Sequence, residues 1–75
     1  MSRQSLSQGG DPVFDIPEPR VVALKMLALL QPEYGQHPKY AWLEKQLTGL
    51  THRRHQLGAV IFMLRVMQHK EQFFV

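Results

Sequence analysis

The sequence predicts an all-α protein, a compact three-helix domain in which the second and third helices resemble a helix–turn–helix. Apolar residues recur every three or four positions over three stretches, and prolines and glycines separate these stretches. β-branched residues are sparse and do not alternate with polar ones, so no strand is predicted. Because the chain has 75 residues and no cysteine, we expect one marginally stable domain without disulfides.

The N-terminal residues differ in composition from the rest of the chain. Residues 1–12 are mainly serine, glutamine and glycine, which cannot bury enough apolar surface to offset the entropy of ordering a backbone. We therefore expect a flexible tail over residues 1–12 and a folded domain over residues 13–75. An apolar group just before the first helix is expected to lie across that domain as a short extended segment: Val13, Phe14 and Ile16.

The charge and composition restrict the classes of function. Nine Lys and Arg residues against six Asp and Glu give a net charge of +3, which permits contact with phosphates or acidic protein surfaces. The only serines lie at positions 2, 5 and 7, and the carboxylates are scattered, so we expect neither an enzyme nor a cofactor. No apolar run is long enough to span a membrane or form a signal peptide. With the absence of cysteine, this favours a cytoplasmic protein.

Prolines delimit the first two helices. The first is predicted from about Glu18 to Gln31, because Pro32 disfavours helical dihedrals in the residue before it. Apolar residues cover most of its circumference, which predicts a helix buried on nearly every side at the centre of the domain. Pro38 opens the second helix. Its apolar stripe contains four residues, Tyr40, Leu43, Leu47 and Leu50.

The third helix is predicted from Thr51, as its cap, to about Lys70, and it has more apolar surface than one small core requires. The face expected to enter the core comprises Leu57, Val60, Ile61, Leu64 and Met67. A second apolar patch contains Ala59, Phe62, Met63 and Val66, and the apolar end of the chain adds Phe73 and Phe74. The residues of the second patch extend the apolar surface well round the helix and leave a narrow polar stripe, which consists of Arg54, Gly58, Arg65 and His69.

Two interpretations of the second patch remain open. In the first, the patch is covered by the first helix, by Phe14 and by Phe73 or Phe74, and the polar stripe is simply solvated. In the second, the patch is a dimer interface or a site for a protein partner, because a large exposed apolar surface usually marks an interaction. Gly58, which costs about 1 kcal/mol inside a helix, either is tolerated or allows another backbone to approach.

Basic residues are concentrated in the first turn of the third helix. His52 and His55 lie one turn apart, but a zinc site needs three or four ligands and no further ligand completes the set, so no metal site is predicted. Together with Arg53 and Arg54 they form a polar cluster. Positive charge at a helix N-terminus opposes the helix dipole, and a bound anion would relieve this repulsion.

The segment from Leu43 to Leu64 resembles a helix–turn–helix, with a turn over residues 48–51 and a basic start to the longer helix. In that family the beginning of the second helix enters the major groove, where Arg binds guanine or phosphate. The resemblance implies a small non-enzymatic DNA-binding regulator, which we expect to be dimeric. Its nucleic-acid contacts would come from His52, Arg53, Arg54, His55 and Arg65.

The sequence therefore leaves two function classes in competition. The first is the DNA-binding regulator, with duplex DNA as the partner and self-association into a dimer. The alternative is a helical protein-interaction module, an adaptor or inhibitor, that binds through an exposed apolar face and the apolar C-terminal end. The interface predicted for self-association or for a protein partner comprises Ala59, Phe62, Met63, Val66, Phe73 and Phe74.

Overall fold

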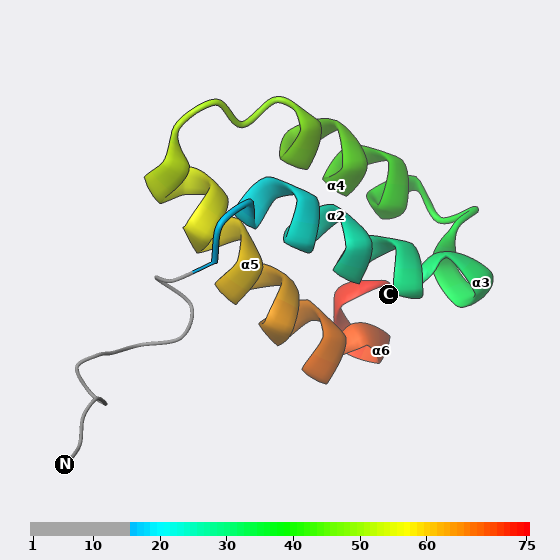
Figure 1. The fold of residues 1–75 in the computed structure, drawn as a ribbon. Helices are drawn as coiled ribbons and strands as arrows, with labels where there is room; N and C mark the ends of the chain where they lie inside the picture. Colours follow the sequence, from blue (N-terminus) through cyan, green and yellow to red (C-terminus); the bar gives the residue numbers. More distant parts are fainter. Residues whose placement is uncertain (1–15) are drawn as a thin grey trace, which may run out of the picture.

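The computed structural model describes residues 16–75 (Figure 1). No strand occurs within residues 16–75. The predicted all-α three-helix domain is confirmed, and two short helices of one turn accompany the three long ones. The tail predicted over residues 1–12, and the predicted contacts of Val13 and Phe14, lie outside the described residues. The helices are α2 (Pro19–Leu29), α3 (Gln31–Tyr34), α4 (Pro38–Thr48), α5 (Arg53–Gln68) and α6 (Lys70–Phe73).

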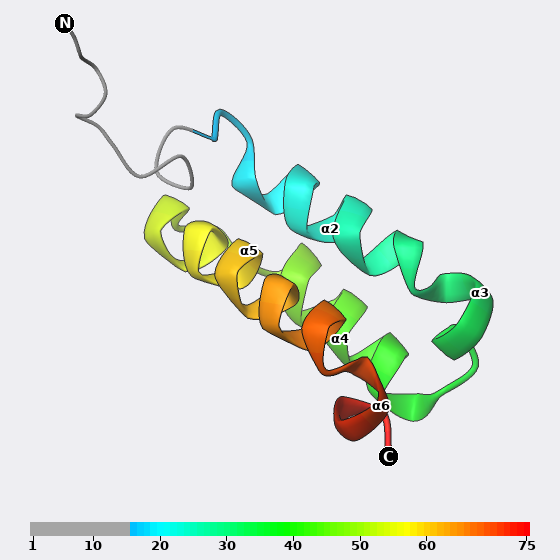
Figure 2. The same ribbon diagram turned by 90° about the horizontal axis from the view of Figure 1, so that it is seen from below.

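Helix α2 is the element on which both other long helices pack, and α4 and α5 contact α2 far more than each other. Figure 1 shows α4 and α5 flanking α2, and Figure 2 shows all three running lengthwise, with α4 in the opposite direction to α2 and α5. The central position predicted for α2 is thus correct. Its burial on nearly every side is not, because Val21 is 39% exposed and Leu29 is 68% exposed.

The helix boundaries follow local chemistry. Pro19 stands in the first turn of α2, and Pro38 in the first turn of α4, as predicted. His37 caps α4, since its Nδ1 accepts a hydrogen bond of 3.0 Å from the backbone N–H of Lys39. The cap predicted at Thr51 is wrong: the residue before α5 is His52, and its side chain makes no capping bond.

The core is apolar and comes from all three long helices and the C-terminus. No polar or charged side chain is buried among residues 16–75. The predicted stripe of α4 is confirmed for its first three members, and Leu50 is half-buried. The buried apolar residues are Ala23, Leu27, Leu30, Tyr40, Leu43, Leu47, Leu57, Ala59, Val60, Met63, Val66 and Phe74.

Helix α5 is rotated about its axis relative to the sequence prediction. Leu57 and Val60 are buried as expected, but Ile61 is 41% exposed and Leu64 is 43% exposed. The side of α5 that packs into the core instead contains residues of the second apolar patch, and Met63 is fully buried. Small Ala23, also fully buried on α2, leaves room at the centre of the bundle for a larger apolar side chain.

The C-terminal residues fold back onto the domain. The ring of Phe74 stacks on Tyr34 with ring centroids 4.4 Å apart, and the ring of His37 approaches it edge-on. Lys39 donates a hydrogen bond of 2.6 Å from Nζ to the backbone oxygen of Phe73. The first interpretation of the apolar end, in which the terminal aromatics cover the core, is therefore correct for Phe74.

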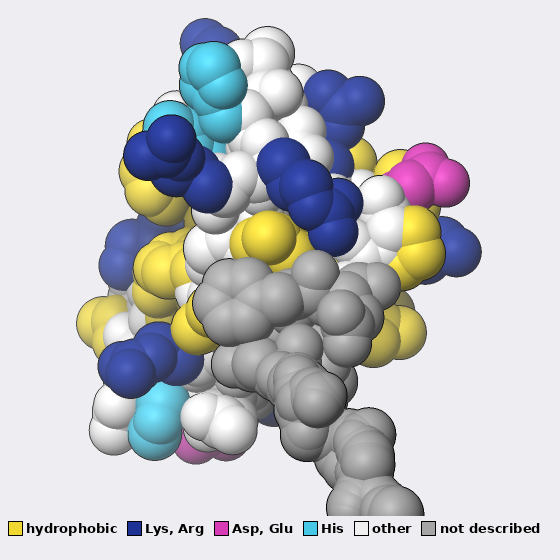
Figure 3. Space-filling view, turned by 60° about the vertical axis from the view of Figure 1, so that its left-hand side comes forward, with side chains coloured by type: hydrophobic (Ala, Val, Ile, Leu, Met, Phe, Trp, Pro, Cys, Tyr) yellow, Lys and Arg dark blue, Asp and Glu magenta, His cyan; other side chains and the backbone are white. Residues whose placement is uncertain are grey.

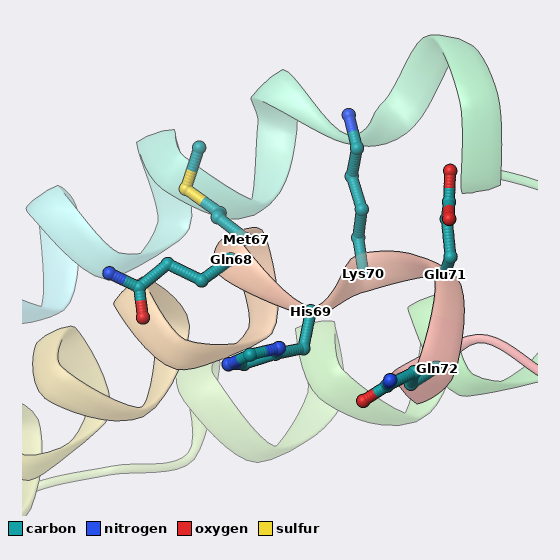
Figure 4. Close-up of a pocket in the computed structure, with 6 residues that line it drawn as sticks. All are labelled: Met67, Gln68, His69, Lys70, Glu71 and Gln72. Atoms are coloured by element: carbon teal, nitrogen blue, oxygen red, sulfur yellow. The ribbon is translucent and has the colours of Figure 1, made fainter.

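An exposed ion pair fixes α6 against α3. Lys70 Nζ lies 3.1 Å from Glu33 Oε1, and this hydrogen bond, with the carboxylate charge, raises the pKa of Lys70. Figure 4 shows the Lys70 side chain extending from α6 towards the ribbon of the α2–α3 segment. Within residues 16–75, no helix has both the length and the apolar composition that crossing a membrane requires.

Candidate interaction surface on α5

The solvent-facing side of α5 carries a continuous strip of side chains, which we call the outer face. Positions 54, 58, 61 and 65 follow one another at spacings of four, three and four, so they lie along one side of the helix. Phe62 and Leu64 flank this line and are both partly exposed. The outer face consists of Arg54, Gly58, Ile61, Phe62, Leu64 and Arg65.

Gly58 leaves an opening in the middle of the outer face. A Cβ atom built on it would meet no atom within 4 Å, so no other part of residues 16–75 approaches its backbone. The close approach of another helix considered for Gly58 therefore does not occur within the described chain. Within residues 16–75, Gly58 is exposed.

The electrostatics of the outer face are one-sided. Helix α5 contains no Asp or Glu, and neither Arg54 nor Arg65 forms an ion pair with any of residues 16–75. Figure 3 shows basic and histidine side chains near the top and the bottom of its left-hand side, with hydrophobic side chains and a further basic one between them. The outer face is thus apolar in the middle and cationic at both ends.

A shallow hollow adjoins the outer face near the end of α5. Its volume is about 340 Å³, enough for one or two apolar side chains of a ligand. The Phe62 and Phe73 rings meet edge-to-face at its wall, with centroids 5.8 Å apart. The hollow combines an apolar floor with polar groups at its margin, and it is lined by Phe62, Arg65, Val66, His69, Gln72 and Phe73.

The structure corrects most of the predicted partner interface. Ala59, Met63, Val66 and Phe74 are buried in the core and are not available to a partner in this conformation. Of that set, only two residues retain accessible surface, Phe62 and Phe73.

Ile61 and Leu64 belong to the accessible apolar surface but were assigned to the core by the sequence. The spacing of apolar residues shows that most of the circumference of α5 is apolar, but it does not show which part of that surface α2 covers. Ala23 of α2 is buried and leaves room for a neighbouring helix, but Ala28 of the same helix is exposed, so the alanines of α2 do not identify the contact side by themselves.

Only some of the residues predicted to bind nucleic acid lie close together in the structure. His52, Arg54 and His55 are exposed at the start of α5, where the two histidine rings meet edge-to-face. Arg53, in contrast, donates hydrogen bonds from its guanidinium to the backbone oxygens of Ile16 and Pro17. Its side chain therefore ties the segment before α2 to α5. Arg65 lies three turns further along the helix.

The His, Asp and Glu side chains of residues 16–75 do not gather into a metal site, because no three of them are close enough to share an ion. A second hollow, of about 300 Å³, lies at the break between α5 and α6. In Figure 4 Met67 and Lys70 point to one side of the chain while His69 and Gln72 point to the other, so these groups do not converge on a ligand.

Compared with known protein families, curated proteins and solved structures, the chain shows no significant match. Its candidate function therefore depends on the outer face and the hollow beside it.

Proposed function

We propose that the chain is a small, non-enzymatic binding module that holds another polypeptide on the outer face of α5. The observation that carries this proposal is the group of exposed apolar side chains, Ile61, Phe62 and Leu64, beside the opening at Gly58. Single exposed apolar residues are common on protein surfaces, but a contiguous group on one helix usually belongs to an interface.

The distribution of polar groups supports the same proposal. Arg is among the residues enriched at protein interfaces, and a polar rim around an apolar centre is the usual anatomy of such surfaces. Arg54 and Arg65 stand at the two ends of the apolar centre. Ile61, Phe62 and Leu64 do not belong to the core cluster or to the side chains packed against it.

Photo-crosslinking in cells that make the protein tests the proposal. A photoreactive phenylalanine analogue replaces Ile61, and the matched control carries it at Lys45, an exposed position on α4. We expect a discrete crosslinked product from position 61 and none from position 45. The same products from both positions, or no product from either, would reject the proposal.

Duplex DNA is the second candidate ligand. It is favoured by the exposed side chains of His52, Arg54 and His55 at the start of a helix without carboxylates. The expected result is salt-sensitive binding of a mixed duplex that weakens on Arg54→Ala but not on the control Lys45→Ala. Arg53→Ala would also weaken binding if Arg53 joins the contact. No binding of any duplex at about 50 mM salt would exclude this candidate.

A further inference from the structure

We infer that the occupant of the outer face is an acidic amphipathic α-helix contributed by a different protein. This inference rests on the proposed function, because it names the chemistry of the polypeptide that the outer face holds. It follows from three features: the positions of Arg54 and Arg65, the shape of the apolar surface between them, and the poor fit of a second copy of the chain.

The cations fix the length and charge pattern of the occupant. Arg54 and Arg65 are separated by three helical turns, or roughly 16 Å at 1.5 Å per residue. Neither has an ionic partner among residues 16–75, and α5 supplies no carboxylate. A helix lying lengthwise on α5 matches both cations when it carries carboxylates about three turns apart.

The surface between Arg54 and Arg65 determines where the bound helix must carry apolar side chains. At Gly58 a side chain of the occupant can approach the α5 backbone, since no atom of residues 16–75 lies within 4 Å of the position that a Cβ would take. About one to two turns further along, the hollow beside Phe62 and Phe73 admits a second one. Apolar residues at every third or fourth position of a helix provide such a pair, and helix-in-groove recognition uses this spacing.

A second copy of α5 fits this surface poorly. Arginines stand at both ends of the apolar centre, so pairing two outer faces in parallel brings Arg54 against Arg54 and Arg65 against Arg65. Pairing them antiparallel brings Arg54 of one copy close to Arg65 of the other. With no carboxylate on α5, like charges meet in either case, which opposes association.

The inference is tested with a synthetic helical peptide of about sixteen residues, carrying leucines at every third or fourth position and glutamates about three turns apart. Fluorescence anisotropy measures its binding to the full chain. A control peptide has lysines in place of the glutamates. We expect the glutamate peptide to bind at least about tenfold more tightly, and its affinity to fall with added salt.

Charge reversal on the protein complements the charge reversal on the peptide. The double variant Arg54→Glu, Arg65→Glu is expected to lose about tenfold in affinity for the glutamate peptide and to gain affinity for the lysine peptide. Both positions are exposed and unpaired within residues 16–75, so the variant should keep the helical circular dichroism of the parent. Lys45→Glu, a reversal on α4, should leave the peptide preference unchanged.

Three results would overturn the inference: equal binding of both peptides, no binding of either, or a dimer in sedimentation equilibrium that Ile61→Glu dissociates. The proposed function fails separately. Position-specific crosslinks from Ile61 to a polypeptide without an acidic helix would retain the function and refute the inference, whereas the absence of crosslinks would refute the function itself.

Discussion

Replacing Gly58 with alanine should stabilise the domain while impairing its interactions. Gly58 lies inside α5, between Leu57 and Ala59, with a helical backbone conformation. Alanine is compatible with this conformation, and its Cβ would meet no atom within 4 Å, so the substitution neither creates a clash nor fills a cavity. Only the difference in backbone entropy and helix propensity remains.

That difference sets the magnitude. Alanine is favoured over glycine inside a helix by about 0.8–1.0 kcal/mol. For a domain of this size, such a gain raises the midpoint of thermal unfolding by roughly 4–8 °C. The opposite sign is expected for Gly35→Ala, because a Cβ there would lie 2.7 Å from the backbone oxygen of Gln31.

Urea and thermal unfolding followed by circular dichroism at 222 nm measure both variants. A lower midpoint for Gly58→Ala would show that α5 has a close neighbour at this position and would refute the open outer face. The same variant should bind the acidic peptide more weakly than the parent. If Gly58→Ala is more stable than the parent but binds the peptide more weakly, glycine at this position serves binding. If the variant is more stable and binds equally well, glycine is merely tolerated there.

Three further substitutions test the packing and the surface. Phe74→Ala should cost about 3 kcal/mol of unfolding free energy, at the lower end for a buried Phe, whereas Val75→Ala at the exposed terminus should cost nothing measurable; equal effects would contradict the folded-back C-terminus. Arg53→Gln should release the segment that contains Ile16 and Pro17, seen as faster proteolysis there, and an unchanged cleavage pattern would count against the tie. Ile61→Glu should lower the free energy of unfolding by no more than about 1 kcal/mol, because the side chain is 41% exposed, and a loss of several kcal/mol would place it in the core.

The bundle was predictable because periodicity and proline positions are local signals. Pro19 and Pro38 stand in the first turns of their helices, and Tyr40, Leu43 and Leu47 form the predicted core stripe of α4. These features depend on the chain within one or two helical turns. Helix α5 is preceded by His52, which makes no side-chain capping bond, and not by the predicted cap Thr51, so even local boundaries shift by a residue.

The orientation of α5 was not predictable from its own residues. Because more than half of the circumference of α5 is apolar, the helix could be rotated about its axis in several ways that bury a similar apolar area. Packing against α2 selects the one that buries Met63 and Val66 and leaves Ile61 and Leu64 in solvent. The exposed apolar surface of α5 consequently lies on a different side of the helix from the predicted interface.

The structural role of Arg53 also escaped the sequence. Its neighbours suggested a basic cluster, but its guanidinium donates to backbone oxygens thirty-six and thirty-seven positions away. A contact across such a separation follows from the packing of α2 beside α5. No pattern within the first turn of α5 indicates it.

A crosslinking profile along the bundle tests most directly the claim that the outer face of α5 holds another polypeptide. The photoreactive residue is placed in turn at Arg54, Ile61, Arg65 and, on other sides of the domain, at Lys45 and Lys25. We expect crosslinks to one common partner from the three α5 positions and little crosslinking from the two lysine positions, all five of which are exposed. Equal yields from all five positions, or a maximum on α2 or α4, would contradict this claim.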